Sequence, residues 1–431
     1  MHPQTNGERA ESPDKEWRQR CAVAAIAALI AFARMPDRFL HGFLWAEDGR
    51  IFLVQAHYLG FRSIITPYAG YLHVIPRVIA LAFLKIAPVV AAPLSFAWVS
   101  AAILCASCAY LLGFARKVMA TPAAWVFALS PILIPHTGEV WLTVTNLQWV
   151  LAPALLVLLV ETFCSPLMGA SGPRGDALRG IAIVVLSLTG PFCLLFLPII
   201  VLCLIATRRV SRRRSTRLAI GAYVICCLVQ LVTLVVSPAE DRGTRGPRHS
   251  LMAFAHFPWK EHFLHYVALD FAMPTVWSNR MGNHWPIAAI ACAVAVVVCC
   301  IFAGKNRRVL CCALVAMAVG LWVLGIMRAD AWTFALKWDV IGGRYFYEPF
   351  IFLSWAVLLS LVTSPYPAIR FLAGSILTMV MLNSISVFNA PDYTPSTVTA
   401  TADGAASMLN VPPSPYWDIK IQGSDLFTSP N

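Results

Sequence analysis

RLAIGAYVICCLVQLVTLVV, residues 217–236, is a stretch of twenty residues whose only charge is the arginine at its start. A helix of about 20 apolar residues is long enough to cross a hydrocarbon layer about 30 Å thick. Apolar runs recur along the 431-residue chain, which is 59% hydrophobic and 13% charged, against roughly 25% charged residues in soluble domains. A mean hydropathy of +0.70 excludes a water-soluble globule. The sequence therefore predicts an all-α protein whose solvent is the bilayer.

Basic residues on either side of the apolar runs set the expected topology. They form short clusters at Arg116-Lys117, Arg208 to Arg217 and Lys305 to Arg308. Such an excess of Lys and Arg marks cytoplasmic loops. This pattern predicts a polytopic helical bundle of about eleven spans in a bacterial inner membrane, with a cytoplasmic N-terminus. The expected divisions are a cytoplasmic tail at 1–20, a transmembrane domain at 21–388 and an extracytoplasmic tail at 389–431.

The formal charge of +12 does not indicate nucleic acid, because its residues lie in these loop clusters rather than on one exposed face. The 13 cysteines lie in or beside apolar runs, which favours neither a disulfide framework nor a zinc site. We find no ligand pattern for a divalent metal and expect no cofactor. The polar C-terminal tail either packs over the outer vestibule through Tyr416-Trp417 or is flexible.

Residues 72–90 form an apolar run that contains two cations, Arg77 and Lys85. Counting this run as a span would place Arg116-Lys117 outside the cell, against the charge rule. We therefore expect an interfacial helix whose long cationic side chains extend to the membrane surface.

The first expected outer loop, residues 35–71, contains the carboxylate pair Glu47-Asp48 among aromatic residues. A carboxylate at the membrane surface can take a proton from an acceptor that attacks the anomeric carbon of a carrier-linked sugar. The pair can also be a solvated turn, because Asp-Gly is a common turn dipeptide. The following stretch favours the first interpretation.

That stretch, PYAGYLHVIPR, brings Tyr68, Tyr71, His73 and Arg77 to the level where a lipid phosphate lies. One span, an outer loop with an acidic pair, then His73-Val74-Ile75-Pro76-Arg77 leading an interfacial helix resembles the GT-C superfamily of membrane glycosyltransferases. Its members include protein O-mannosyltransferases, aminoarabinose transferases and O-antigen glucosyltransferases. The resemblance covers roughly residues 20–210 and matches no complete signature. It implies a GT-C-like fold in which Asp48 and Glu47 supply the base or organise the acceptor.

A second candidate group begins a late span, at Gly342-Gly343-Arg344-Tyr345. Arginine binds phosphodiesters through paired hydrogen bonds, and GT-C enzymes often carry an arginine in a late outer loop. Arg344 and Tyr345 are therefore candidates for binding the carrier phosphate. The alternative is a helix anchor at the headgroup level.

A third group lies on the hairpin tip at 136–146. His136 and Glu139, with Asn146 and Gln148 beside them, are placed where they could hydrogen-bond a sugar. Helix capping and solvation of the tip are the alternative.

These residues predict a glycosyltransferase that moves a sugar from a polyprenyl-phosphate donor to a cell-envelope glycan or lipid acceptor on the extracytoplasmic face. A flippase for lipid-linked glycans is the first alternative, and it predicts ionisable residues inside the spans. A non-catalytic assembly protein is the second, and it predicts that the outer carboxylates are dispensable.

Overall fold

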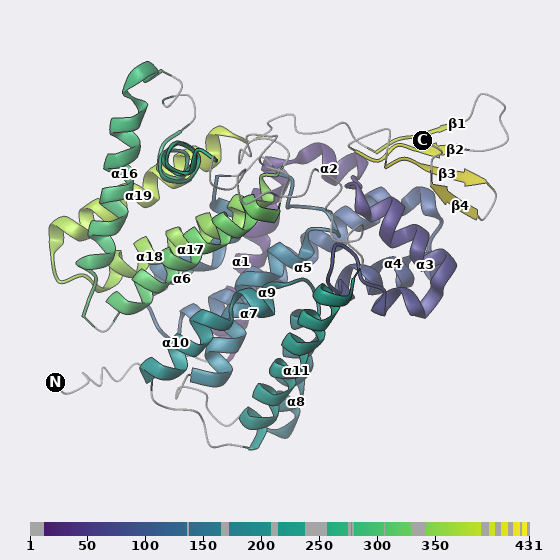
Figure 1. Cartoon of the computed structure of the whole chain (residues 1–431), viewed down its shortest axis with the longest axis horizontal. Coiled ribbons are helices and arrows are strands. Elements are labelled where there is room, and N and C mark those ends of the chain that lie inside the picture. The colour runs from purple at the N-terminus through teal and green to yellow at the C-terminus, as the bar shows by residue number, and fades with distance from the viewer. Residues whose placement is uncertain are drawn as a thin grey trace.

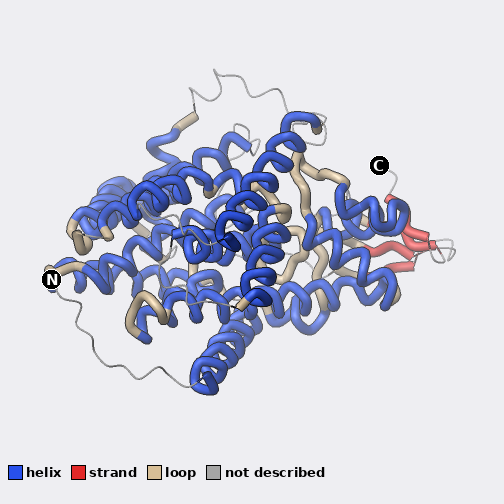
Figure 2. Tube along the Cα trace, turned by 90° about the horizontal axis from the view of Figure 1, so that it is seen from below, coloured by secondary structure: helices blue, strands red, loops and turns tan. Residues whose placement is uncertain are grey.

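The computed structural model describes residues 13–135, 138–164, 172–207, 214–237, 257–274, 277, 280–305, 307–328, 342–388, 396–400, 407–412, 417–422 and 425–428. Helices dominate this part of the chain (Figures 1 and 2). The α-helices of its first half are α1 (Pro13–Arg34), α2 (Pro36–His41), α3 (Val54–Leu59), α4 (Val74–Ile86), α5 (Ala92–Ala115), α6 (Thr121–Leu133), α7 (Leu147–Cys164), α8 (Pro173–Ser187), α9 (Phe192–Leu195) and α10 (Leu197–Thr207). The second half adds α11 (Arg214–Val236), α13 (Trp259–His262), α14 (Asp270–Ala272), α16 (Trp285–Ile301), α17 (Arg308–Arg328), α18 (Arg344–Thr363) and α19 (Pro367–Ser386).

Six segments among the described residues are long and apolar enough to cross a membrane. They are Val89–Ala115, Arg214–Val236, Gly282–Ile301, Arg308–Arg328, Arg344–Thr363 and Pro367–Ser386. Three further apolar helical segments among the described residues, Thr121–Leu133, Leu147–Phe163 and Phe192–Ile205, are shorter than these candidates. The helical class and the membrane character of the chain are thus confirmed, with six candidate spans.

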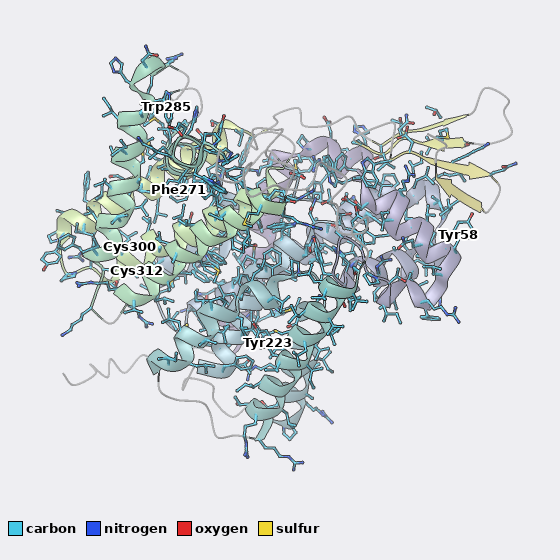
Figure 3. The ribbon with its side chains drawn as sticks, in the orientation of Figure 1. Tyr58, Tyr223, Phe271, Trp285, Cys300 and Cys312 are labelled. Atoms are coloured by element: carbon cyan, nitrogen blue, oxygen red, sulfur yellow. The ribbon has the colours of Figure 1, made fainter. Side chains whose placement is uncertain are left out.

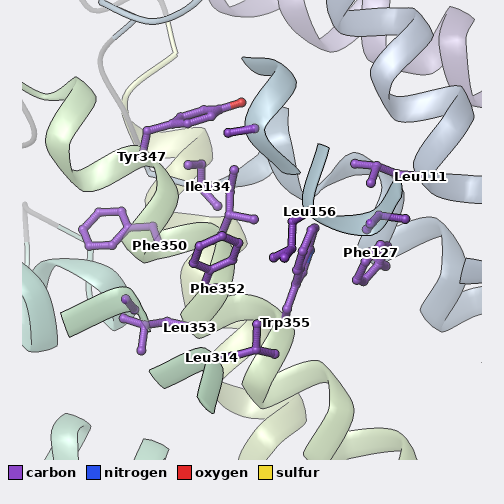
Figure 4. Packing of buried hydrophobic residues seen from close by; sticks show 14 of the residues in the cluster. Leu111, Phe127, Ile134, Leu156, Leu314, Tyr347, Phe350, Phe352, Leu353 and Trp355 are labelled. Carbon is purple, nitrogen blue, oxygen red and sulfur yellow. The ribbon is translucent and has the colours of Figure 1, made fainter. Parts of the chain in front are cut away.

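Helix α18 lies at the centre of the bundle, and 78% of its apolar stretch is buried inside the protein. Its aromatic side chains pack against α6, where Trp355 stacks on Phe127 with ring centroids 4.2 Å apart (Figure 4). Pro131 interrupts the hydrogen bonding of α6, because proline has no N–H to donate to the carbonyl of Phe127. The hydroxyl of Ser130 donates to that carbonyl instead, at 2.8 Å. The bundle therefore accommodates a proline without leaving this backbone oxygen unpaired in an apolar core.

The C-terminal tail contributes a small sheet that the sequence analysis did not predict. Its strands are β1 (Val398–Ala400), β2 (Ser407–Leu409), β3 (Ile419–Gln422) and β4 (Asp425–Thr428). They pair antiparallel in the order β1-β2-β3-β4. The sheet lies at the edge of the molecule beside α3, where the hydroxyl of Tyr58 donates to the carbonyl of Leu426 at 2.7 Å (Figures 1 and 3).

The residues that flank the sheet accept hydrogen bonds from the backbone of the first loop. Leu44 N–H donates to Ser396 Oγ at 3.0 Å, and Ala46 N–H donates to the carbonyl of Pro412 at 2.6 Å. Trp417 packs on Phe43, Trp45 and Ala46. Trp417 thus contacts the first loop, whereas Tyr416 lies outside the described residues. The tail and the first loop therefore lie on the same face of the protein.

Helix α4 covers most of the run 72–90, which we expected to form an interfacial helix. Its 13 residues span about 20 Å at 1.5 Å per residue, which is too short to cross the hydrocarbon layer. The expectation that its cations reach the surface is wrong for Arg77, which is 0% exposed. Arg77 points into the protein because Gln55, on α3, accepts a hydrogen bond from its guanidinium at 2.8 Å. Lys85 lies over the ring of Phe61 at 4.3 Å.

Candidate functional site

Three short segments, two of them in the first loop, meet at one place, and each contains a strained residue. Among the described residues, the only non-glycine residues with positive φ are Ala46 (31°), Ala69 (55°) and Leu142 (60°). Left-handed backbone costs an L-residue of order 1–3 kcal/mol and persists only where the surroundings impose it. Such strain is concentrated at functional sites, and here it marks the acidic pair, the Tyr68–Tyr71 turn and the hairpin tip.

The stretch PYAGYLH forms a tight turn that positions two tyrosines. Tyr68 and Tyr71 exchange backbone hydrogen bonds of 3.0 and 3.2 Å across Ala69-Gly70. Both central residues have positive φ, 55° and 87°, which is the pattern of a two-residue hairpin turn. Arg328, the last residue of α17, donates to the carbonyl of Ala69 at 2.6 Å. The turn is therefore held from outside in its strained conformation.

Asp48 is a buried scaffold residue in this structure. One carboxylate oxygen accepts the backbone N–H of Trp45 at 2.9 Å, and the other accepts the N–H and hydroxyl of Thr145 at 2.6 and 2.7 Å. Burial raises the pKa of Asp48 to about 7, although these hydrogen bonds lower it. Both oxygens are thus used in closing the first loop and binding it to the hairpin tip.

Glu47 differs from Asp48 in that only one of its carboxylate oxygens is used in a hydrogen bond within the described part of the chain. The hydroxyl of Tyr68 donates to its Oε1 at 3.2 Å, and its Oε2 has no hydrogen-bond partner among the described residues. Burial raises the pKa of Glu47, whereas the charge of Arg344 lowers it. The structure therefore brings an acidic residue of the first loop within electrostatic reach of the arginine that begins α18.

Arg344 is held in place by Glu139 of the hairpin tip. Glu139 Oε1 forms an ion pair with the guanidinium at 2.8 Å, and Oε2 accepts the backbone N–H groups of Gly342 and Arg344 at 3.0 and 3.1 Å. Glu139 is 1% exposed, whereas the side chain of Arg344 is 26% exposed. Glu139 thus caps the start of α18 and orients Arg344, while Arg344 keeps an accessible face.

Tyr345 and Tyr71 border the same region. The ring of Tyr345 lies 5.7 Å from Trp149 and 5.3 Å from the guanidinium carbon of Arg344. Tyr345 also packs closely on α17, where Gly325 leaves the space that it needs. Tyr71 is half-buried, with its ring 4.6 Å from that of His73.

His73 supplies an aromatic surface rather than a positive charge. It is 1% exposed and lies among the rings of Phe52, Tyr68 and Tyr71, with centroid distances of 4.6 to 5.9 Å. Burial, followed by the charge of Arg77, lowers the pKa of His73 to about 3. The imidazole is therefore neutral at physiological pH and cannot serve as a cation for a phosphate.

Arg77 is a buried cation without an acidic partner. Among the described residues no carboxylate forms an ion pair with it, and its Nε and Nη2 atoms have no hydrogen-bond partner. Its guanidinium carbon lies 5.3 Å from the ring of Phe52. Burial lowers the pKa of Arg77 to about 10, so the group stays protonated at physiological pH. A buried charge of this kind costs several kcal/mol unless it is paired.

The C-terminal sheet covers the back of the acidic pair. Gly49 lies so close to the sheet that a Cβ there would come within 2.5 Å of Ile419 Cδ1 and 3.2 Å of Val411 Cγ2. Asp418 accepts the backbone N–H of Val411 at 2.8 Å and so fixes this part of the tail. Only glycine fits at position 49 without displacing these side chains.

Most of the candidate residues predicted from the sequence are brought together. Glu47, Asp48, Tyr71, His73, Arg77, Glu139, Arg344 and Tyr345 border one region, whereas His136 lies outside the described residues. Sequence reasoning missed Thr145, Gln55 and Arg328, whose roles depend on contacts between distant elements. In the part of the chain that the structure describes, no three His, Cys, Asp or Glu residues are grouped as metal ligands.

Comparison with protein-family models and with curated proteins gives no match for this chain.

Proposed function

We propose that this protein is a membrane glycosyltransferase that moves a sugar from a polyprenyl-phosphate carrier to a hydroxyl of a cell-envelope glycan or lipid. The supporting observation is the meeting of Glu47, with a carboxylate oxygen that lacks a partner, and the partly exposed Arg344. One group can accept a proton and the other can stabilise an anion. Transfer from a lipid phosphate requires both abilities in one place.

In the proposed reaction, Glu47 takes the proton of the acceptor hydroxyl. The acceptor oxygen forms a bond with the anomeric carbon while the bond from that carbon to the carrier phosphate oxygen breaks. The phosphate leaves with the electron pair as an anion. Tyr68 donates to Glu47 Oε1 at 3.2 Å and so orients the carboxylate. Asp48 and Glu139 act as positioning residues, because their oxygens are used in hydrogen bonds to the scaffold.

Arg344 and Arg77 are the proposed cations for the carrier phosphate. Arg344 is accessible and rigidly oriented, and fixed cations stabilise charge that develops in a transition state. Arg77 is buried beside the Tyr68–Tyr71 turn without a carboxylate partner. An anion bound there would offset the cost of keeping its charge out of water.

The proposed architecture and membrane orientation follow from the resemblance of the sequence to the GT-C superfamily. We propose a GT-C-like architecture of about eleven spans in a bacterial inner membrane, with the site on the extracytoplasmic face. The basic clusters between apolar runs and the order of the motifs support this orientation.

The test is sugar transfer in membranes that contain the full chain and a labelled polyprenyl-phosphate hexose. Native protein is expected to release carrier phosphate and to label an envelope glycan or lipid. Glu47→Gln is expected to lose transfer by a factor of about 10² to 10⁴, the contribution typical of a general base. Asp37→Asn is the matched control, because Asp37 lies on α2 with a side chain that is 79% exposed. Transfer that is equal in all three proteins would refute the proposed site.

One observation favours a flippase as a second candidate. Glu348 lies within α18, is 0% exposed, and has no hydrogen-bond partner for either carboxyl oxygen among the described residues. Ionisable residues inside spans often mark translocation routes. Movement of a lipid-linked glycan across proteoliposomes without donor consumption, abolished by Glu348→Gln and not by Glu47→Gln, would favour this candidate over the transferase.

A further inference from the structure

A groove of about 920 Å³ runs between α8 and α11, outside the candidate site. The two helices lie side by side at the edge of the bundle (Figure 1). The lining is mainly apolar or small, with Asp176 and Arg214 as its charged members. The lining residues are Pro173, Asp176, Ala177, Gly180, Ile181, Val184, Val185, Arg214, Ser215, Leu218, Ala219 and Ala222.

The two helices run parallel, so their N-termini lie together at one end of the groove. Pro173 and Arg214, at the starts of α8 and α11, both line it. At the other end of α8, the side chain of Gln230 on α11 donates to the carbonyls of Ser187 and Gly190 at 3.3 and 3.0 Å. Two helix N-termini at one end make that end favourable for an anion.

Side-chain charge reinforces this polarity. Arg174, Arg214 and Arg217 are exposed at the N-terminal end, and Asp176 is the one acidic residue of the described helical segments beside them. Beyond this end, the groove is lined by apolar or small side chains, among them Ile181, Val184 and Ala222. The surface thus combines a cationic end with an apolar body, which complements an amphiphile with an anionic head.

We propose that this groove binds an anionic phospholipid, with the phosphate at Arg174 and Arg214 and one acyl chain between α8 and α11. From Pro173 to Val185 the groove extends about 18 Å along the helix axis, at 1.5 Å per residue. That length matches one leaflet of a hydrocarbon layer about 30 Å thick. Basic pockets between membrane helices are known to bind the head groups of anionic lipids.

The proposal is tested on the full chain, purified in detergent and stripped of lipid. Binding of fluorescent phosphatidylglycerol is measured in competition with unlabelled phosphatidylglycerol or phosphatidylcholine. Arg174→Gln and Arg214→Gln are each expected to weaken phosphatidylglycerol binding about fivefold, the effect of one arginine near an anionic head group. Ala177→Leu, which fills the groove, is expected to weaken binding of both lipids.

Arg370→Gln is the matched control. Arg370 is an exposed arginine near the start of α19 and does not line the groove, so this variant is expected to bind like native protein. Equal competition by the two lipids would overturn the proposal of an anionic head-group site. Binding that survives Ala177→Leu unchanged would place the lipid elsewhere. A stable dimer that is lost with Ala177→Leu, in the absence of lipid binding, would make the groove an interface between copies and also refute the proposal.

Discussion

Replacing Glu47 and Asp48 separately is expected to produce two different defects, although the residues are adjacent. Glu47→Gln keeps the size of the side chain and leaves the three hydrogen bonds of Asp48 intact. Its expected effect is a loss of about 10² to 10⁴ in kcat with little change in stability. Asp48→Ala removes the acceptor of three buried donors instead. Its primary expected effect is on the free energy of unfolding.

The size of the Asp48 effect follows from its contacts. The N–H of Trp45 and the N–H and hydroxyl of Thr145 would each lose their acceptor. A buried donor left unpaired costs about 1–3 kcal/mol, which gives a loss of about 3–6 kcal/mol after partial relaxation. Burial raises the pKa of Asp48 from 3.8 to about 7, so the folded state favours the neutral carboxyl. The stability that this preference contributes is complete below about pH 4 and declines as pH rises toward 7.

The assay combines transfer kinetics with thermal unfolding monitored by a thiol-reactive dye. Cys108, Cys193 and Cys311 are buried free thiols, so they become reactive when the bundle opens. Asp48→Ala is expected to unfold at a lower temperature than native protein, and its penalty is expected to be larger at pH 5 than at pH 8. A fully stable Asp48→Ala protein without transfer activity, beside an active Glu47→Gln protein, would refute the division of roles.

Three further predictions concern the surroundings of the pair. Arg344→Gln is expected to shift the acidic limb of the pH–rate profile to higher pH, because the charge of Arg344 lowers the pKa of Glu47; Glu139→Gln is expected to shift it to lower pH, because the charge of Glu139 raises that pKa. Shifts of equal sign would contradict this arrangement. Arg77→Met is expected to raise the stability of the empty protein by about 1–4 kcal/mol, since it removes a buried unpaired charge, and to raise KM for the donor; an unchanged KM would exclude Arg77 from donor binding. Gly49→Leu is expected to displace the C-terminal sheet, which limited proteolysis would detect as faster cleavage of the tail than in native protein; an equally resistant tail would show that the sheet adapts.

The sequence predicts the helical bundle well because each apolar run indicates a helix without any knowledge of tertiary contacts. The six candidate spans are helices, since a backbone in lipid must satisfy its hydrogen bonds within the segment. The tail sheet escaped prediction because its strands have only three or four residues. In β3, Ile419-Lys420-Ile421-Gln422 alternates as a strand should, but four residues are too few to decide.

The sequence indicates which polar residues are candidates, but it does not show which of them the scaffold uses in hydrogen bonds. Glu47 and Asp48 have the same chemistry in the sequence, and only the position of Thr145 shows that Asp48 is used by the scaffold. The buried position of Arg77 depends on Gln55, a residue without a distinctive pattern around it. The roles of these residues can be assigned only from tertiary contacts, because a polar side chain on an apolar helix can point into the protein or toward its surface.

The attachment of the tail sheet to the first loop has a consequence for biosynthesis. The loop around the acidic pair leaves the ribosome about 350 residues before Ser396 and Pro412, which accept hydrogen bonds from its backbone. At about 5–20 residues per second, the delay is on the order of tens of seconds. During that interval the first loop lacks these contacts, so the surroundings of the acidic pair are completed only after the tail has been made.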